Sequence, residues 1–249
     1  MTRYLNYKTF LLIIMLLIPF CSYADEQTIP FLVSKEAQGT VTYGLSIKIL
    51  GFMAVLTVLP ALLMTMSAFT RIMIVLAIAR QAIGIPNIPN NQIIIGLSLI
   101  MTLFVMSPII EQINDTGVQP YLQGKISDKE AFDLSSDVLK GFMLKQTRKA
   151  DLSTFVRISK TKPEVASNYS IFIIMPAFIT SELKTAFEIG FLIFLPFLII
   201  DLVIASILMS MGMMMLSPMV ISLPFKILFF VLVDGWSLII TSLLTSFRI

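Results

Sequence analysis

Four long apolar runs constrain the fold of this chain more than any other feature of its sequence. They cover residues 43–66, 92–113, 186–208 and 219–244. Each reaches the roughly 20 residues that a helix needs to cross the hydrocarbon core of a bilayer. Apolar residues make up 57% of the chain and charged residues only 13%, about half the charged share of an ordinary soluble domain. The sequence therefore predicts an all-α membrane protein.

The N-terminus has the organisation of a cleavable secretory signal. Two basic residues, Arg3 and Lys8, precede an apolar stretch, and Ser-Tyr-Ala at 22–24 forms a small-x-small cleavage site. We expect the leader 1–24 to be removed, so that a polar segment over 25–42 begins the mature chain outside the cytoplasm. An uncleaved anchor helix is the alternative.

Proline and glycine divide the apolar runs into two helical hairpins. The Pro- and Asn-rich stretch 86–91 interrupts any helix between the first two runs, which predicts a first hairpin over 43–113. A second hairpin is expected over 181–249. Pro60, Pro108 and Pro196 also lie within apolar runs. Because each removes a backbone hydrogen bond, kinked or broken helices are expected there.

The positive-inside rule orients these elements. With the N-terminus outside, the link 67–91 falls on the inner side with Arg71 and Arg80. The segment 114–180 then lies outside, although it is rich in Lys and Arg, because long segments translocate largely regardless of charge. A capping-box pattern at 127–130 predicts that this extracytoplasmic segment is helical. Its charges are most simply a solvated face.

A methionine cluster at the turn of the second hairpin is the clearest indication of function. Met211, Met213, Met214 and Met215 surround Gly212. Methionine is unbranched, flexible and polarizable, so several together form a soft surface that fits many shapes. Such a surface could close a pore against small molecules and still part for a large passenger. An ordinary hydrophobic turn or core is the alternative.

Charged residues inside the second hairpin are expected to pair. Asp201 and Lys226 are equally far in sequence from the methionine cluster, so an antiparallel hairpin brings them to the same depth. A charge at the bilayer centre costs about 3 kcal/mol on insertion scales, which favours an ion pair that locks the hairpin or a neighbouring subunit. A proton relay is the alternative. Glu182, Glu188 and Arg71 are predicted as possible subunit contacts.

Several function classes are unsupported by the composition. The chain contains no His, and its single cysteine, Cys21, lies in the leader. We therefore expect no metal site, no cofactor and no enzymatic activity based on Cys or His. A phosphate-binding loop is absent from the sequence. The basic residues are scattered, without the aromatic interleaving of a nucleic-acid surface.

Several motifs extend over nearly all of the mature chain. They are Met66-Ser-Ala-Phe-Thr-Arg-Ile72, Pro176-Ala-Phe-Ile-Thr-Ser-Glu-Leu-Lys-Thr-Ala-Phe-Glu-Ile-Gly190, Pro196-Phe-Leu-Ile-Ile-Asp201, Met211-Gly-Met-Met-Met215, Leu223-Pro-Phe-Lys226 and Val231-Leu-Val-Asp-Gly-Trp236. Together they resemble the FliP family of flagellar type III export-gate proteins. The long block over 176–190 is the most specific of them.

This resemblance implies a particular assembly and role. It implies a pentamer that forms a helical export-gate channel with FliQ and FliR, beside FlhB and FlhA of the export apparatus, in the flagellar basal body of the bacterial inner membrane. Unfolded export substrates would pass through this channel, and Met211, Met213, Met214 and Met215 would form its gasket. The resemblance also implies that the hairpins need not span the bilayer as ordinary transmembrane helices do. An injectisome homologue is one alternative. A small-solute or ion transporter that uses Asp201 and Lys226 is a weaker one, and a purely structural scaffold for the basal body is a third.

Overall fold

The computed structural model describes residues 44–85, 88–160, 169–213 and 216–247. The chain divides into two compact units, Met1–Gly51 and Phe52–Ile249. The expected leader 1–24 and polar segment 25–42 lie outside the described residues. Signal cleavage therefore stays a prediction.

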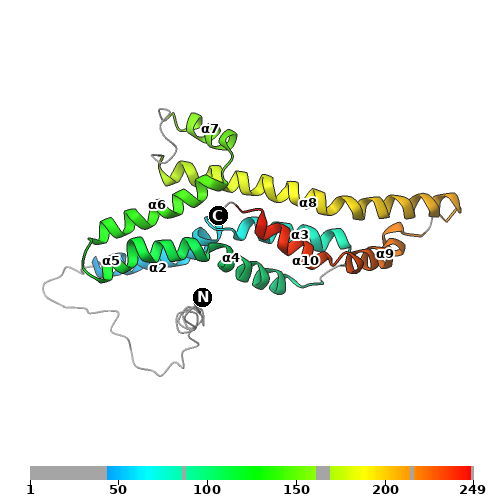
Figure 1. The fold of residues 1–249 in the computed structure, drawn as a ribbon, viewed down its shortest axis with the longest axis horizontal. Coiled ribbons are helices and arrows are strands. Elements are labelled where there is room, and N and C mark those ends of the chain that lie inside the picture. The colour runs from blue at the N-terminus through cyan, green and yellow to red at the C-terminus, as the bar shows by residue number, and fades with distance from the viewer. Residues whose placement is uncertain (1–43, 86–87, 161–168, 214–215, 248–249) are drawn as a thin grey trace, which may run out of the picture. The chain divides into compact units, whose positions relative to one another are not determined.

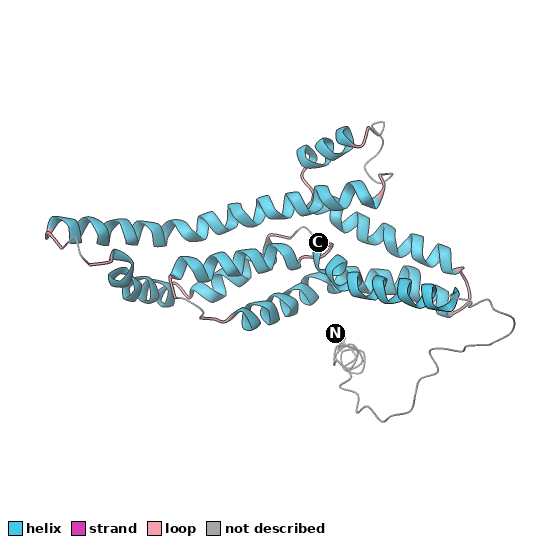
Figure 2. Cartoon of the chain, turned by 180° about the vertical axis from the view of Figure 1, so that it is seen from behind, coloured by secondary structure: helices cyan, strands magenta, loops and turns pink. Residues whose placement is uncertain are grey.

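The described residues form helices joined by short loops, and no strand is present among them (Figure 1 and Figure 2). In chain order the helices are α2 (Gly44–Thr65), α3 (Phe69–Ile83), α4 (Asn91–Ile113), the π-helix η1 (Asn114–Val118), α5 (Gln119–Leu122), α6 (Asp128–Gln146), α7 (Lys149–Ile158), α8 (Ile171–Ser210), α9 (Pro218–Leu232) and α10 (Gly235–Thr245).

Within the part of the chain that the structure describes, two helical runs are long and apolar enough to cross a membrane. Asn91–Leu122 joins α4, η1 and α5 into 32 residues, and α8 extends over 40 residues. Helices α9 and α10 would form a third span together, although they meet at a bend of 62°. The prediction of an all-α membrane protein is confirmed.

Helix α3 occupies the region in which the sequence predicted a link between the first two runs. Its residues Ile72, Val75, Leu76 and Ala79 are buried at spacings of three and four, which places them on one face of the helix. This face lies at the centre of the larger apolar core and packs against α4 and α8. With 15 residues, α3 is too short to resemble a span, and the sequence analysis missed it as an element.

The prolines at 60, 108 and 196 do not break the helices that contain them. Helices α2, α4 and α8 continue through Pro60, Pro108 and Pro196. A proline removes one hydrogen bond from the helix ladder and leaves the others in place. The helices are therefore not broken at these positions, and the kinks expected there stay a prediction.

The fourth apolar run breaks instead at Asp234, between α9 and α10. Asp234 adopts a left-handed conformation with φ 49°, which ends the α9 geometry. Gly235 follows, and a Cβ at this position would lie 2.2 Å from Cε2 of Phe230. The bend thus depends on a residue without a side chain, because the Phe230 ring occupies the space that a side chain would need.

The segment between the two hairpins builds a second, smaller core. The predicted capping box is confirmed, because the Ser127 backbone N–H donates to the Glu130 carboxylate at 2.9 Å while the Ser127 hydroxyl accepts from the Glu130 N–H. The hydrogen bonds from Ser127 lower the pKa of Glu130. Further along α6, Phe142 packs on Phe178 of α8 with ring centroids 6.0 Å apart. Helix α8 therefore begins within this core, before the expected start of the second hairpin at 181.

Candidate functional site

Helix α8 ends in a turn that is built for a sharp reversal of the chain. Gly212 has φ 74°, a left-handed conformation that glycine adopts without steric cost. The Met213 N–H donates to the carbonyl oxygen of Leu208 at 3.0 Å, which is the hydrogen-bond pattern of a Schellman helix end. The chain then enters α9 at Pro218, whose fixed φ suits the first helical position.

This turn presents methionine side chains, and we call residues 209–216 the methionine loop. Met211 is 65% exposed and Met209 is 66% exposed, whereas Met213 is half-buried. Met214 and Met215 lie outside the described residues, so their place in the gasket stays a prediction. The Met209 and Met211 side chains are therefore accessible to another surface.

A polar junction joins α8 and α9, the two helices of the hairpin that carries the methionine loop. Lys226 Nζ donates to Asp201 Oδ2 at 2.6 Å, and Ser222 Oγ donates to Asp201 Oδ1 at 2.5 Å. Ser222 and Lys226 lie one turn apart on α9, so both reach the same carboxylate of α8. The Lys226 side chain is 4% exposed and the Asp201 side chain 29%. The structure thus brings Asp201 and Lys226 together, while a role of the pair in assembly stays a prediction.

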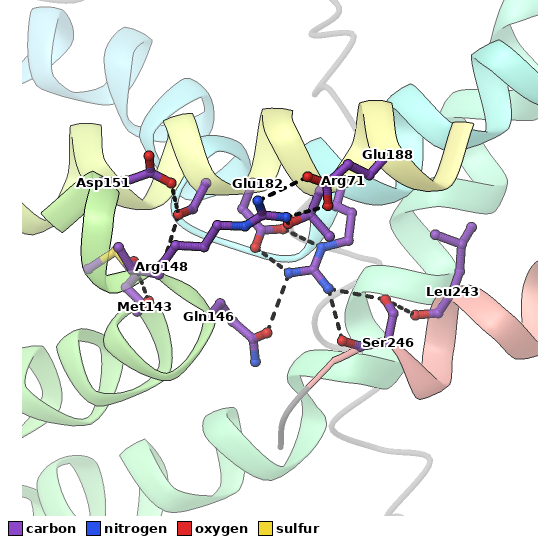
Figure 3. A network of polar contacts seen from close by, with 12 residues as sticks. Arg71, Met143, Gln146, Arg148, Asp151, Glu182, Glu188, Leu243 and Ser246 are labelled. Carbon is purple, nitrogen blue, oxygen red and sulfur yellow. Dashed lines mark hydrogen bonds and ion pairs between the residues drawn. The ribbon is translucent and has the colours of Figure 1, made fainter. Parts of the chain in front are cut away.

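A second polar network surrounds Arg71 (Figure 3). The guanidinium contacts both carboxylate oxygens of Glu182, with Nε 2.8 Å from Oε2. Nη1 donates to the carbonyl and hydroxyl oxygens of Ser246, both at 3.1 Å, and Nη2 donates to Gln146 Oε1 at 3.4 Å. The ring centroid of Phe247 lies 4.1 Å from Arg71 Cζ, a cation–π distance. One side chain of α3 therefore connects α6, α8 and the C-terminal residues.

A third set of contacts docks α7 on α8 (Figure 3). Arg148 Nη1 donates to Glu188 Oε1 at 3.0 Å, and Nη2 pairs with Oε2. This hydrogen bond raises the pKa of Arg148. The Arg148 backbone N–H donates to Ser181 Oγ at 2.8 Å, and the Ser181 hydroxyl donates to Asp151 Oδ2 at 2.6 Å. The start of α7 is thus held at three points.

The residues predicted as possible subunit contacts occupy two different environments. Arg71 and Glu182 are 2% and 0% exposed and pair with each other within the chain, while a role in subunit contacts stays a prediction. Glu188 is exposed, and its role as a contact stays a prediction. The sequence analysis missed Gln146 and Ser246 as partners of Arg71, because they lie 75 and 175 residues away. An arginine within the apolar pattern of α3 is the signal that could have indicated a buried network.

These features define a class of protein. The described residues form a helical membrane protein whose buried polar side chains hold helices together. None of these residues forms a group of three or more His, Cys, Asp or Glu side chains that could hold a metal ion. A hairpin with exposed methionines at its turn is the most distinctive surface.

Comparison with known proteins then identifies the family. The FliP family profile matches residues 52–243. The chain belongs to the FliP family, and the resemblance seen in the sequence is confirmed.

Similar proteins agree with this assignment over most of their length. The flagellar biosynthetic protein FliP of Cereibacter sphaeroides is 50% identical over 219 residues, which cover 88% of this chain and 73% of the relative. The protein of the same name from Bacillus subtilis strain 168 is 51% identical over 203 residues, which cover 81% and 92%. That of Agrobacterium fabrum strain C58 is 41% identical over 243 residues, which cover 96% and 99%.

Proposed function

We propose that this chain is a core subunit of the flagellar type III protein export gate, and that its methionine loop closes the channel through which unfolded flagellar proteins pass. Membership of the FliP family and relatives named flagellar biosynthetic protein support the flagellar role. The observation that carries the gate is the loop itself, in which Met209 and Met211 project from the turn of a hairpin with fixed legs. The role is structural and not catalytic.

The proposed assembly is a pentamer of this chain with FliQ and FliR, in contact with FlhB and FlhA, in the bacterial inner membrane at the flagellar basal body. The segment 114–180 would lie on the periplasmic side. Apolar side chains on α8 support a large assembly surface, because Phe187, Phe191 and Leu202 are each more than 60% exposed. Other subunits or lipid would cover this surface in the membrane.

Methionine suits this gate for a physical reason. Its thioether chain rotates about three bonds and is polarizable, so facing methionines fill an irregular constriction without a rigid fit. A ring of such side chains would exclude water and ions while the gate is closed. The same side chains would move aside for a polypeptide because each contact is individually weak.

A solute transporter that uses Asp201 is the weaker candidate. Both carboxylate oxygens of Asp201 already accept hydrogen bonds from α9. Discrete solute sites in transporters form at interrupted helices near the midplane, whereas α8 continues through Pro196 and Asp201. The carboxylate is thus better suited to hold the hairpin than to bind a passing ion.

The test shortens the methionine side chains of the loop without changing its backbone. Met213, Met214 and Met215 are replaced by Ala in cells that make the whole export gate. We expect entry of small solutes or ions at normal amounts of assembled complex. The matched control replaces Met53 and Met64, two exposed methionines of α2, and should remain tight. A tight gate in the loop variant would refute the gasket, and saturable flux that depends on Asp201 would support the transporter.

A further inference from the structure

The C-terminal end of α3 has a buried carbonyl group that needs a partner. The last four carbonyls of a helix have no hydrogen-bond donor within it, and Ala82 lies in this last turn of α3. Ala82 is 0% exposed, so water does not replace the missing donor. A buried backbone oxygen of this kind is normally satisfied by another part of the protein.

Lys226 supplies that partner from α9. Its Nζ lies 3.4 Å from the carbonyl oxygen of Ala82, across 144 positions of sequence. This distance is at the long end for a hydrogen bond. The interaction is therefore mainly the attraction between an ammonium group and the negative end of a helix dipole. The same ammonium contacts Asp201 of α8 at 2.6 Å, so it faces acceptors from two other helices.

Close packing brings α9 to this position. Gly84 ends α3 with φ 84°, and a Cβ at Gly84 would lie 3.6 Å from Leu223 Cδ1 and 3.8 Å from Lys226 Nζ. A side chain as small as a methyl group would thus reach α9 from this position, so the end of α3 lies beside one turn of α9. Because α3 is the most deeply packed part of the larger core, this contact ties the hairpin to a rigid element.

We propose that Lys226 is the positioning residue of the methionine gate. Its contact with Asp201 holds α8 against α9, and its contact with the Ala82 carbonyl holds this hairpin against the core. These two contacts together set the position at which the methionine loop closes. Flexible methionine side chains fill a constriction but do not determine where it forms, so the legs of the hairpin must be held. This inference rests on the proposed function.

The proposal differs from a simple ion pair in what a charge swap should do. In the double variant Asp201→Lys with Lys226→Asp, the attraction between α8 and α9 is retained. The shorter carboxylate side chain at position 226 has no proton to donate, so the buried Ala82 carbonyl loses its partner. In Asp201→Asn, by contrast, the ammonium stays on the end of α3. A simple pair predicts that the swap is the milder change, whereas the three-helix junction predicts that it is the more severe.

The experiment uses the full chain in cells that make the whole export gate. The substitution Ala82→Cys introduces a reporter thiol and keeps the backbone carbonyl, and Cys21 is changed to Ser. Labelling of this thiol by a membrane-permeable maleimide reports opening of the junction, and small-solute entry reports gate closure. Both are normalised to the amount of chain in the membrane. Lys184→Met removes a charge from an exposed position of α8 and serves as the control.

We expect about tenfold faster labelling of the reporter thiol and measurable leak in the swap variant, because breaking a buried charge contact opens the site locally. Asp201→Asn should raise labelling less than the swap does, because the Lys226 ammonium stays on the Ala82 carbonyl and the amide oxygen of the asparagine still accepts a hydrogen bond from it. Lys184→Met should match the parent. Failure of the swap variant alone to accumulate would have the same meaning as fast labelling. A swap variant that accumulates, labels slowly and stays tight would overturn the proposal, as would equal effects in Asp201→Asn and the swap.

The two readouts separate this inference from the gate on which it rests. Labelling of the reporter thiol depends on the α3–α9 contact and not on the methionines. If the methionine-to-alanine variant stays tight while the swap labels fast, the gasket is wrong and the anchor stands. If the methionine variant leaks while the swap stays protected and tight, the gasket stands and the role of Lys226 is refuted.

Discussion

Two glutamates of α8 each pair with an arginine from another helix region, and these two pairs allow the effect of burial on an ion pair to be measured within one protein. In each pair the guanidinium contacts both oxygens of the carboxylate. The side chains of Arg71 and Glu182 are 3% and 0% exposed, whereas those of Arg148 and Glu188 are 32% and 54% exposed. Replacement of either glutamate by Gln is therefore the same chemical change in two environments.

The buried pair should be much more sensitive to this change. Glu182→Gln leaves Arg71 charged without its counter-ion, and breaking a buried pair in this way costs about 3–5 kcal/mol. The lower end applies, because the Gln carbonyl still accepts one hydrogen bond and Ser246 keeps its two contacts with Arg71. We expect the free energy of unfolding to fall by about 3 kcal/mol. Glu188→Gln should leave it close to the parent value, because water solvates both partners.

The single tryptophan of the chain provides the assay. Trp236 packs edge-to-face on Phe230 with centroids 5.3 Å apart, so its fluorescence should report loss of tertiary packing. Denaturant titrations of the purified protein in detergent, parent and both variants, give the two differences directly. Equal losses in the two variants, or a loss below about 1 kcal/mol for Glu182→Gln, would refute the argument from burial.

Three further predictions concern a packing contact, a buried hydroxyl and a titratable cap. Gly190→Ala should lower the free energy of unfolding by about 1–3 kcal/mol. The reason is that a Cβ at position 190 would lie 2.5 Å from Cδ1 and 3.3 Å from Cβ of Ile78. Thermal unfolding measures this loss. Ser98→Ala should raise the free energy of unfolding by about 1 kcal/mol in the same assay, because the Ser98 hydroxyl is buried without a hydrogen-bond partner among the described residues. Acid should loosen the first turn of α6, as seen by amide exchange. The pKa of Glu130 is lowered by Ser127, so this stabilisation is present above the ordinary pKa of a glutamate and is lost as the pH falls through the lowered value.

Matched control variants show whether each change acts through the contact named for it or through a non-specific loss of stability. Gly96 lies in α4 with no atom within 4 Å of an added Cβ, so Gly96→Ala should be neutral or slightly stabilising. A similar loss at Gly96 and Gly190 would contradict the packing argument. A decrease in stability for Ser98→Ala would mean that its hydroxyl has a partner after all. Glu130→Gln should abolish the acid effect on α6, and persistence of that effect would assign it to another group.

Local patterns determined much of what this chain is. The apolar runs over 92–113 and 186–208 become α4 and part of α8, because a helix that satisfies its own backbone is the stable form of a long apolar segment in lipid. The capping box at 127–130 forms as its spacing indicates. The equal distances of Asp201 and Lys226 from the turn were enough to predict their contact. In each case the deciding interactions lie within one helix or one hairpin.

Tertiary structure decided what those patterns left open. The burial of α3 and the four-element network of Arg71 depend on contacts between distant parts of the chain. The break at Asp234 is local, but it needs the ring of Phe230 to pack against a residue without a side chain, which the apolar pattern does not show. The network needs partners up to 175 residues away. The Ala82 carbonyl finds Lys226 for the same reason, since a buried helix end must take its donor from whichever element packs against it. Periodicity shows which face of a helix is apolar, but only packing determines which side chains meet across that face.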